Sequence, residues 1–156
     1  MKPYADSNFF TKLYLTLPDS AVAERWLERA QRAGASAPPI TWLHRLEVIN
    51  AFEQHVFVSR VHGSLKITSE QAAAAQAHFR DDVAQSHFID VTQIAPDELM
   101  EQFEDLSLRH TARHGFRTYD LIHVASALLL GCDTFWSFDK KACRLAVLEG
   151  LKLAKR

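Results

Sequence analysis

The stretch from Thr118 to Asp139 reads TYDLIHVASALLLGCDTFWSFD, and the rest of the chain can be placed around it. Its first part, which opens on a suitable N-cap residue, is apolar on nearly every side, and a helix of this composition is buried. Asp120, His123 and Ser126 interrupt the apolar residues at a spacing of three, so they share one narrow stripe of the helix. A β-prone run then ends at Asp139, where a new helical pattern begins. The stretch therefore predicts a helix, a strand and a second helix, with carboxylates at its corners.

Strand-like and helical patterns alternate along the remaining sequence. We expect strands at Tyr4–Ala5, Ile40–Trp42, Phe88–Val91 and Leu151–Leu153, and helices that begin near Pro18, Leu43, Thr68, Pro96 and Lys140. Residues 6–8, which read DSN, are expected to form a turn, and Asp19 is expected to cap the helix after Pro18. Strands that alternate with helices in this way predict an α/β fold with a mostly parallel sheet, covered by helices on both faces.

The length and composition favour a single domain over residues 1–156. The formal net charge of -1 gives no global attraction to nucleic acid, so a polyanion would have to meet a local basic patch. The two cysteines, Cys132 and Cys143, lack the spacing of a metal or redox motif and fit reduced thiols. No apolar run approaches the ~20 residues that span a bilayer, and the first residues do not resemble a targeting segment. We therefore expect a soluble cytoplasmic protein.

Four acidic residues fall at equivalent places in the predicted fold. Asp6 follows the first strand, Glu47 lies near the start of the helix after the second, Asp120 lies in the first turn of the buried helix, and Asp139 follows the fourth strand. Because ligands bind at the carboxyl ends of the strands in open α/β sheets, we expect these side chains to converge on one crevice. Each acid also has an ordinary explanation, as a turn residue, a solvated helix residue or a carboxylate at a helix start.

A cluster of four carboxylates needs cations or protons, because two carboxylates ~4 Å apart repel by about 4 kcal/mol at an effective dielectric near 20. Oxygen ligands without neighbouring cysteines favour a hard ion, Mg2+ or Mn2+. Such an ion can polarise a phosphodiester and lower the pKa of an attacking water. Without the ion, we expect at least one of the four carboxyl groups to titrate with a raised pKa.

The sequence resembles the PIN-domain nucleases and, within them, the VapC-like toxins of bacterial toxin–antitoxin pairs. The resemblance is carried by YADSN with Asp6, LEVINAF with Glu47, YDLIHVASAL with Asp120, and WSFDKKACRLAVLEGLKL with Asp139. It implies an α/β/α sandwich and a metal-dependent endoribonuclease that inhibits growth or translation. It also implies that the four acids bind the metal and carry the catalysis, with Asn8 and Ser137 as supporting polar groups. The implied partners are RNA, a small antitoxin protein and a second copy of the chain.

Several features leave alternatives open. Arg109, Arg113 and Arg117 precede the buried helix and suit either a helix C-terminus or the phosphates of RNA. His123 is expected to be a core or supporting hydrogen-bonding residue rather than a catalytic one. A PIN-like RNA-binding module without turnover is the alternative to an enzyme. Asn8 argues against an aspartyl phosphotransferase, because that class needs an aspartate at this position.

Overall fold

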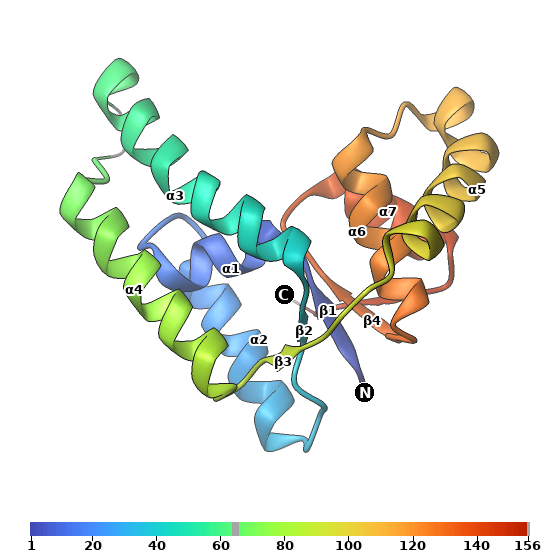
Figure 1. Ribbon diagram of the computed structural model, residues 1–156, viewed down its shortest axis with the longest axis horizontal. Coiled ribbons are helices and arrows are strands. Elements are labelled where there is room, and N and C mark those ends of the chain that lie inside the picture. The colour runs from blue at the N-terminus through green and yellow to red at the C-terminus, as the bar shows by residue number, and fades with distance from the viewer. Residues whose placement is uncertain (64–65, 156) are drawn as a thin grey trace.

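In the computed structural model, which describes residues 1–63 and 66–155, short strands are separated by one or two longer helices (Figure 1). The strands are β1 (Pro3–Ala5), β2 (Pro39–Ile40), β3 (Asp90–Val91), β4 (Thr134–Trp136) and β5 (Lys152–Leu153). The helices are α1 (Ser7–Tyr14), α2 (Ser20–Arg32), α3 (Trp42–His62), α4 (Ser69–Gln85), α5 (Pro96–His114), α6 (Thr118–Leu129) and α7 (Lys140–Leu148). Positions 64, 65 and 156 of the predicted 1–156 domain lie outside the described residues.

The strands form parallel ladders at the centre of the molecule. β4 pairs with β1 on one side and with β5 on the other, so β5 is an edge strand. β2 and β3 pair in parallel as a second ladder, and β2 lies next to β1. The register joins Ala5 to Trp136, so the chain leaves both strands at the same edge of the sheet. These ladders confirm the predicted α/β fold with a parallel sheet flanked by helices.

Alternate residues of β1 and β4 face opposite sides of the sheet, as strand geometry requires. Tyr4 and Phe135 face one side, where their rings stack at a centroid distance of 5.7 Å. Ala5 and Trp136 face the other side. Since none of the four is more than 2% exposed, β1 and β4 are buried on both faces, which explains why these two strands are apolar on both sides.

Helices α1 to α4 cover the face of Ala5 and Trp136, and helices α5 to α7 cover the opposite face (Figure 1). The core under the first group is rich in aromatic side chains, including Phe9, Phe10, Phe52 and Phe79. The core under the second group is mainly aliphatic, including Leu106, Leu121, Val124 and Leu145. Burial of each such side chain contributes about 1.5–3 kcal/mol, so these two clusters hold the layers together.

The expected turn at residues 6–8 is wrong, because α1 begins at Ser7, directly after the first strand. The carboxylate of Asp6 accepts a hydrogen bond from the backbone N–H of Phe9 at 2.9 Å and thereby caps this helix. An Asp in a turn and an Asp at an N-cap make the same kind of local hydrogen bond. The sequence around Asp6 therefore suits both structures, and the packing of Phe9 and Phe10 in the core decides for the helix.

The start of α2 also differs from expectation. Asp19 stands at the N-cap position, but its φ is 72° and its side chain makes no capping hydrogen bond. The hydroxyl of Ser20 instead accepts from the N–H of Leu17 at 2.9 Å and donates to backbone carbonyls before the helix. The left-handed turn at Asp19 is thus stabilised by its neighbour rather than by its own carboxylate.

Among the helices that the structure describes, none is long and apolar enough to cross a membrane. Cys132 is buried and forms no disulfide with Cys143 in the described part of the chain. Burial raises the pKa of the Cys132 thiol to about 11, so it stays protonated at neutral pH and is a poor nucleophile or metal ligand.

Candidate functional site

Asp6 lies at the carboxyl end of β1 and is held there by both its backbone and its side chain. Its N–H donates to the carbonyl of Trp136 at 3.0 Å, which extends the β1–β4 ladder by one residue. Its carboxylate caps α1 at Phe9, and only 4% of the residue is exposed. The sheet edge therefore carries a buried, oriented carboxylate.

Asp139 reaches the same edge from β4, the neighbour of β1 in the sheet. Its carboxylate accepts hydrogen bonds from the N–H groups of Lys141 at 2.7 Å and Ala142 at 3.3 Å, so it caps α7. Ser137 lies between the two acids, because its hydroxyl accepts from the N–H of Asp139 at 2.9 Å and is also hydrogen-bonded to Asp6. The strand pairing thus brings together two of the four acids that the sequence singles out.

Burial raises the pKa of the Asp6 carboxyl above its ordinary value, and the negative charge of Asp139 adds to the effect. His123 and the hydrogen bonds from Ser137 and Phe9 act in the opposite direction. The sequence predicts a raised pKa for at least one of the four acids, and the pKa of Asp6 is raised. The main cause of the raised pKa is burial, and repulsion between the carboxylates of Asp6 and Asp139 makes a smaller contribution.

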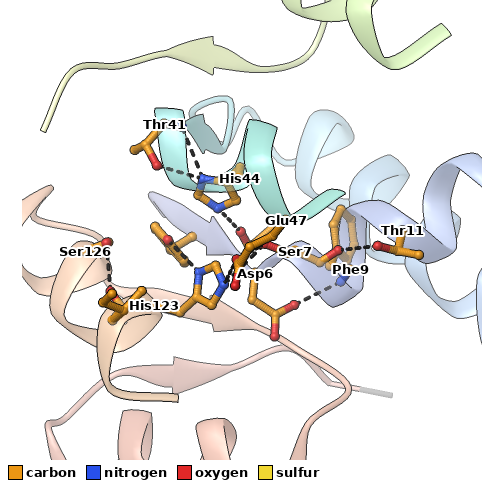
Figure 2. Close-up of polar contacts among 12 residues, drawn as sticks. Asp6, Ser7, Phe9, Thr11, Thr41, His44, Glu47, His123 and Ser126 are labelled. Carbon is orange, nitrogen blue, oxygen red and sulfur yellow. Dashed lines mark hydrogen bonds and ion pairs between the residues drawn. The ribbon is translucent and has the colours of Figure 1, made fainter. Parts of the chain in front are cut away.

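Glu47 projects from α3 toward α1 and α6 (Figure 2). Its Oε2 lies 2.6 Å from Nε2 of His123 and also accepts a hydrogen bond from the hydroxyl of Ser7. Burial alone would raise the pKa of Glu47, but the hydrogen bonds from His123 and Ser7 and the charge of His123 lower it overall. Glu47 is therefore ionised at neutral pH, and 19% of its side chain remains exposed.

The ring of His123 is held at both nitrogens. Nδ1 lies 2.9 Å from the hydroxyl of Tyr4, and Nε2 lies 3.2 Å from the hydroxyl of Ser7 in addition to its contact with Glu47. Burial raises the pKa of Tyr4 well above its ordinary value, so its hydroxyl stays protonated and can donate to Nδ1. Tyr4, in the middle of β1, thus orients the ring of His123, which in turn orients Glu47.

Ser7, His123 and Glu47 are the residue types of a hydrolytic triad, but their geometry is different. In a triad the hydroxyl and the acid contact opposite nitrogens of the imidazole. Here both contact Nε2, and the hydroxyl of Ser7 donates to the carboxylate of Glu47. Ser7 is therefore not activated as a nucleophile, and the arrangement instead positions Glu47.

Asp120 lies in the first turn of α6 and is 6% exposed. Its Oδ2 accepts from the backbone N–H of Arg117 at 2.8 Å, so Arg117, rather than the expected Thr118, is the N-cap. In the described residues, no hydrogen bond or ion pair joins Asp120 to the other three acids. Asn8, predicted as a supporting residue, is exposed on α1 and lies beside Glu47 in the same surface hollow.

The chemistry of these side chains fits a hard divalent ion, because the donors are carboxylate and hydroxyl oxygens. Burial of Asp6 next to the charge of Asp139 also favours a cation there. As the side chains stand, however, the described residues contain no group of three or more acidic, histidine or cysteine side chains arranged to hold an ion. Glu47 is turned to His123 and Asp120 to Arg117, so Asp6 and Asp139 are the pair that the fold itself brings together.

The three arginines considered for RNA binding have different surroundings. Arg109 donates to Asp105 at 2.6 Å and to Glu149 at 2.7 Å, which ties α5 to the end of α7. Its charge is therefore balanced within the protein. Arg113 and Arg117 are exposed, and no ion pair engages them within residues 1–63 and 66–155.

The sequence reasoning missed the contributions of Ser7 and Tyr4. Ser7 follows Asp6 within YADSN, and recognising that α1 begins there would have placed Ser7 at the first helical position, directly after Asp6. The sequence predicts that Tyr4 lies in a strand. Because successive side chains of a strand face opposite sides, Tyr4 faces α6, where His123 lies. The expectation that His123 is a hydrogen-bonded supporting residue agrees with its contacts.

Together, the fold and the acidic edge of its sheet define an α/β protein with a carboxylate-rich site. The sequence profile of the PIN domain matches residues 4–148, so the chain belongs to the PIN-domain family, whose members are typically nucleases that use divalent metals. Among solved structures, the chain is similar to Mycobacterium tuberculosis VapC20, described as a sarcin–ricin loop cleaving toxin, with a TM-score of 0.59 and 17% identity. The match covers 92% of this chain and 94% of VapC20, and at this identity it establishes the fold. A search of curated proteins gives no match.

Proposed function

We propose that this chain is a metal-dependent endoribonuclease that cleaves RNA phosphodiester bonds at the crevice of Asp6, Glu47, Asp120 and Asp139. The proposal is carried by the adjacency of Asp6 and Asp139 at the ends of paired strands, with Ser137 between them. Membership of a family that is typically a nuclease supports the reaction. The similarity to a toxin described as cleaving the sarcin–ricin loop supports RNA as the substrate.

A bound Mg2+ or Mn2+ would polarise the phosphodiester and lower the pKa of an attacking water. Asp6 and Asp139 would hold the ion from fixed positions, because backbone N–H groups at two helix starts orient their carboxylates. Glu47 supplies a further carboxylate whose charge and direction are set by His123 and Ser7 before substrate arrives. Asp120 would contribute from the first turn of α6.

The enzyme is tested by incubating generic single-stranded RNA with the protein, with and without Mn2+. We expect cleavage only with the metal, and we expect Asp6→Asn to abolish it, because the change removes a ligand charge at nearly constant volume. Asp133→Asn, at an exposed aspartate just before β4, is the matched control and should cleave normally. Tight RNA binding without cleavage in Mn2+ would instead support the alternative, a PIN-like RNA-binding module without turnover.

We further propose that the protein is the toxin of a toxin–antitoxin pair, which acts in the cytoplasm on growth or translation and forms a homodimer. The similarity over nearly the whole length of a VapC toxin supports this role. The partner would be a small antitoxin that places an Arg or Lys against the acidic crevice, because a cation there competes with the metal. Expression of the chain should inhibit growth, and co-expression of the small protein encoded beside it should restore growth. Failure of rescue with both proteins present would contradict the toxin role.

We also propose that Arg113 and Arg117 contact RNA phosphates, whereas Arg109, the third candidate, acts through its ion pairs. Changing both exposed arginines to Gln should weaken RNA binding uniformly across sequences and lower the salt slope by about one per lost contact. Arg109→Gln should leave that slope nearly unchanged. An unaltered salt dependence in the double variant would leave Arg113 with a role at the end of α5 and Arg117 with its role at the start of α6.

A further inference from the structure

A surface hollow of about 380 Å³ has Glu47 in its lining, and we call it the Glu47 hollow. Its walls come from α1, α3 and α6, and its lining includes Asn8, Lys12, Glu47, Asn50, Gln54 and Tyr119. Natural ligand pockets span ~300–1,000 Å³, so this hollow lies at the small end of the range. It therefore suits a ligand the size of one nucleotide rather than a folded segment of a protein.

Three carboxamides line the hollow from two helices. Asn50 and Gln54 lie about one and two turns beyond Glu47 on α3 and share its face, and Asn8 comes from α1. All three are exposed, and in the described part of the chain no hydrogen bond engages their side-chain amides. A carboxamide offers a donor and an acceptor side by side, which is the pattern that reads the edge of a nucleobase.

Tyr119 adds a free aromatic surface to the same hollow. It precedes Asp120 in the first turn of α6, and 63% of it is exposed. No ring contact or hydrogen bond of its side chain occurs among the residues that the structure describes. Exposed aromatic rings next to free polar groups are the usual means by which proteins stack unpaired bases of single-stranded RNA.

Positive charge in the hollow is limited. The Nζ of Lys12 donates to the carbonyl of Pro18 at 2.7 Å and lies 5.1 Å from the centre of the Phe138 ring. Burial lowers the pKa of His55, and the charge of Lys12 adds to the effect, so this lining residue is neutral at pH 7. One cation among several amides suits a base with a single phosphate better than a run of backbone phosphates.

We propose that the Glu47 hollow binds one unpaired nucleobase of the RNA strand next to the cleaved bond, with Tyr119 stacked on the base and Asn50 and Gln54 hydrogen-bonded to its edge. Because Glu47 lines the hollow and Tyr119 adjoins Asp120 in sequence, a base held there would have its neighbouring phosphate close to these two acids. This inference rests on the ribonuclease function proposed above and adds the part of the site that selects sequence.

Binding measured in EDTA separates base recognition from cleavage. Short single-stranded RNAs that differ at one position are titrated with protein, and binding is followed by fluorescence anisotropy. Tyr119→Leu should weaken binding of every RNA by roughly tenfold, because stacking is tolerant of sequence. Phe57→Leu is the matched control, because Phe57 is 64% exposed on α3 and lies outside the hollow, and it should bind RNA as the wild type does.

The amide variants test selectivity rather than affinity. Asn50→Ala and Gln54→Ala should each reduce the preference among the four bases by about tenfold, the loss expected for one bidentate contact. Gln31→Ala, at an exposed carboxamide on α2, is the matched control and should keep the preference of the wild type.

Two results would overturn the proposal: Tyr119→Leu binding RNA as tightly as the wild type, or both amide variants keeping the full base preference. A wild-type protein that shows no RNA binding would also overturn it. A wild type that binds RNA with the expected preference, yet does not cleave it in Mn2+, would contradict the proposed ribonuclease and leave the base site standing.

Discussion

The first turns of α3 supply two neighbouring regions of opposite character, an interior one around His44 and a surface one around Glu47. His44 is fully buried, its Nε2 donates to the carbonyl of Ala5 at 2.9 Å, and its Nδ1 accepts from the N–H of Thr41 at 3.1 Å. Glu47, three residues on, is half-buried and held by His123. The ring of Tyr4 lies beside both histidines, at centroid distances of 5.1 Å from His44 and 5.9 Å from His123, and the two imidazole rings are 5.4 Å apart.

The two regions differ in whether the groups that the histidine contacts are all buried or include one that is partly exposed. Around His44 the donors and acceptors pair with one another, and burial lowers the pKa of the ring to about 3, so it stays neutral. Around His123 the hydrogen bonds lead to the carboxylate of Glu47, which is partly open to solvent. The interior region therefore stabilises the fold, whereas the surface region orients the carboxylate of Glu47. Substitutions at five residues sharpen this comparison.

The largest expected effect is on the interior region. His44→Ala should lower the free energy of unfolding by about 3 kcal/mol, because it leaves the N–H of Thr41 and the carbonyl of Ala5 without partners and opens a cavity. The measurement is urea unfolding followed by circular dichroism. A loss comparable to that of a change at an exposed histidine such as His62 would contradict the interior role.

His44 should also make stability depend on pH. Its folded pKa lies below the ordinary value of 6.5, so as pH falls through that value the unfolded chain takes up a proton that the folded chain does not. Stability is therefore lost toward acid, and this residue should remove about 2 kcal/mol between pH 7 and pH 5. In His44→Gln this position cannot titrate, so the unfolding free energy of the variant should fall by about 2 kcal/mol less than that of the wild type between pH 7 and pH 5.

The surface region should instead affect metal binding. His123→Gln and Tyr4→Phe should weaken Mn2+ affinity by roughly 10–100-fold, as is usual when the support of a ligand is removed. Isothermal titration measures the affinity, and the EPR spectrum of bound Mn2+ reports the altered surroundings. Phe79→Leu, a core change on α4 away from Glu47, controls for lost stability alone. Unchanged affinity and spectrum in both the His123 and the Tyr4 variant would show that Glu47 needs no such support.

Asp6 is expected to affect both stability and metal binding, because it is buried and also belongs to the candidate site. Because its pKa is raised, the folded state binds the proton more tightly, and stability is lost as pH rises from the ordinary value through the raised one. Asp6→Asn keeps the helix cap and should raise the Tm of the metal-free protein at neutral pH, by about 2–4 °C for each kcal/mol relieved. Asp133→Asn is the matched control. The pKa of Asp133 is lowered by its hydrogen bond with Thr134, so this variant should not gain stability.

The smallest effect is expected at the surface ion pairs of Arg109. Arg109→Gln should cost about 0.2–1 kcal/mol and should lose its effect at high salt, because exposed pairs are weak and screened. Thermal unfolding in low and high salt measures it. A cost as large as that of His44→Ala would mean that the tie between α5 and α7 belongs to the stabilising interior.

Much of this molecule follows from local sequence patterns. Strand-like patterns that alternate with helical ones predict the parallel sheet. A helix between two strands returns the chain to the start of the sheet, so the next strand runs in the same direction, and the helices cover both faces. Asp6 and Asp139 follow the first and fourth strands in the sequence, and the paired ends of those strands bring the acids together. The buried character of α6 likewise follows from the composition of its residues.

The tertiary structure alone decided which side chains meet. Tyr4, Ser7 and Glu47 converge on His123 from three other elements, although they lie far from it in sequence, and no local pattern specifies such a meeting. Packing also chose between a turn and a helix at Asp6, and it turned Arg109 to Glu149 across the gap between α5 and α7. The physical reason is that periodicity specifies which face of an element is buried, whereas the partner of a polar side chain depends on how whole elements pack.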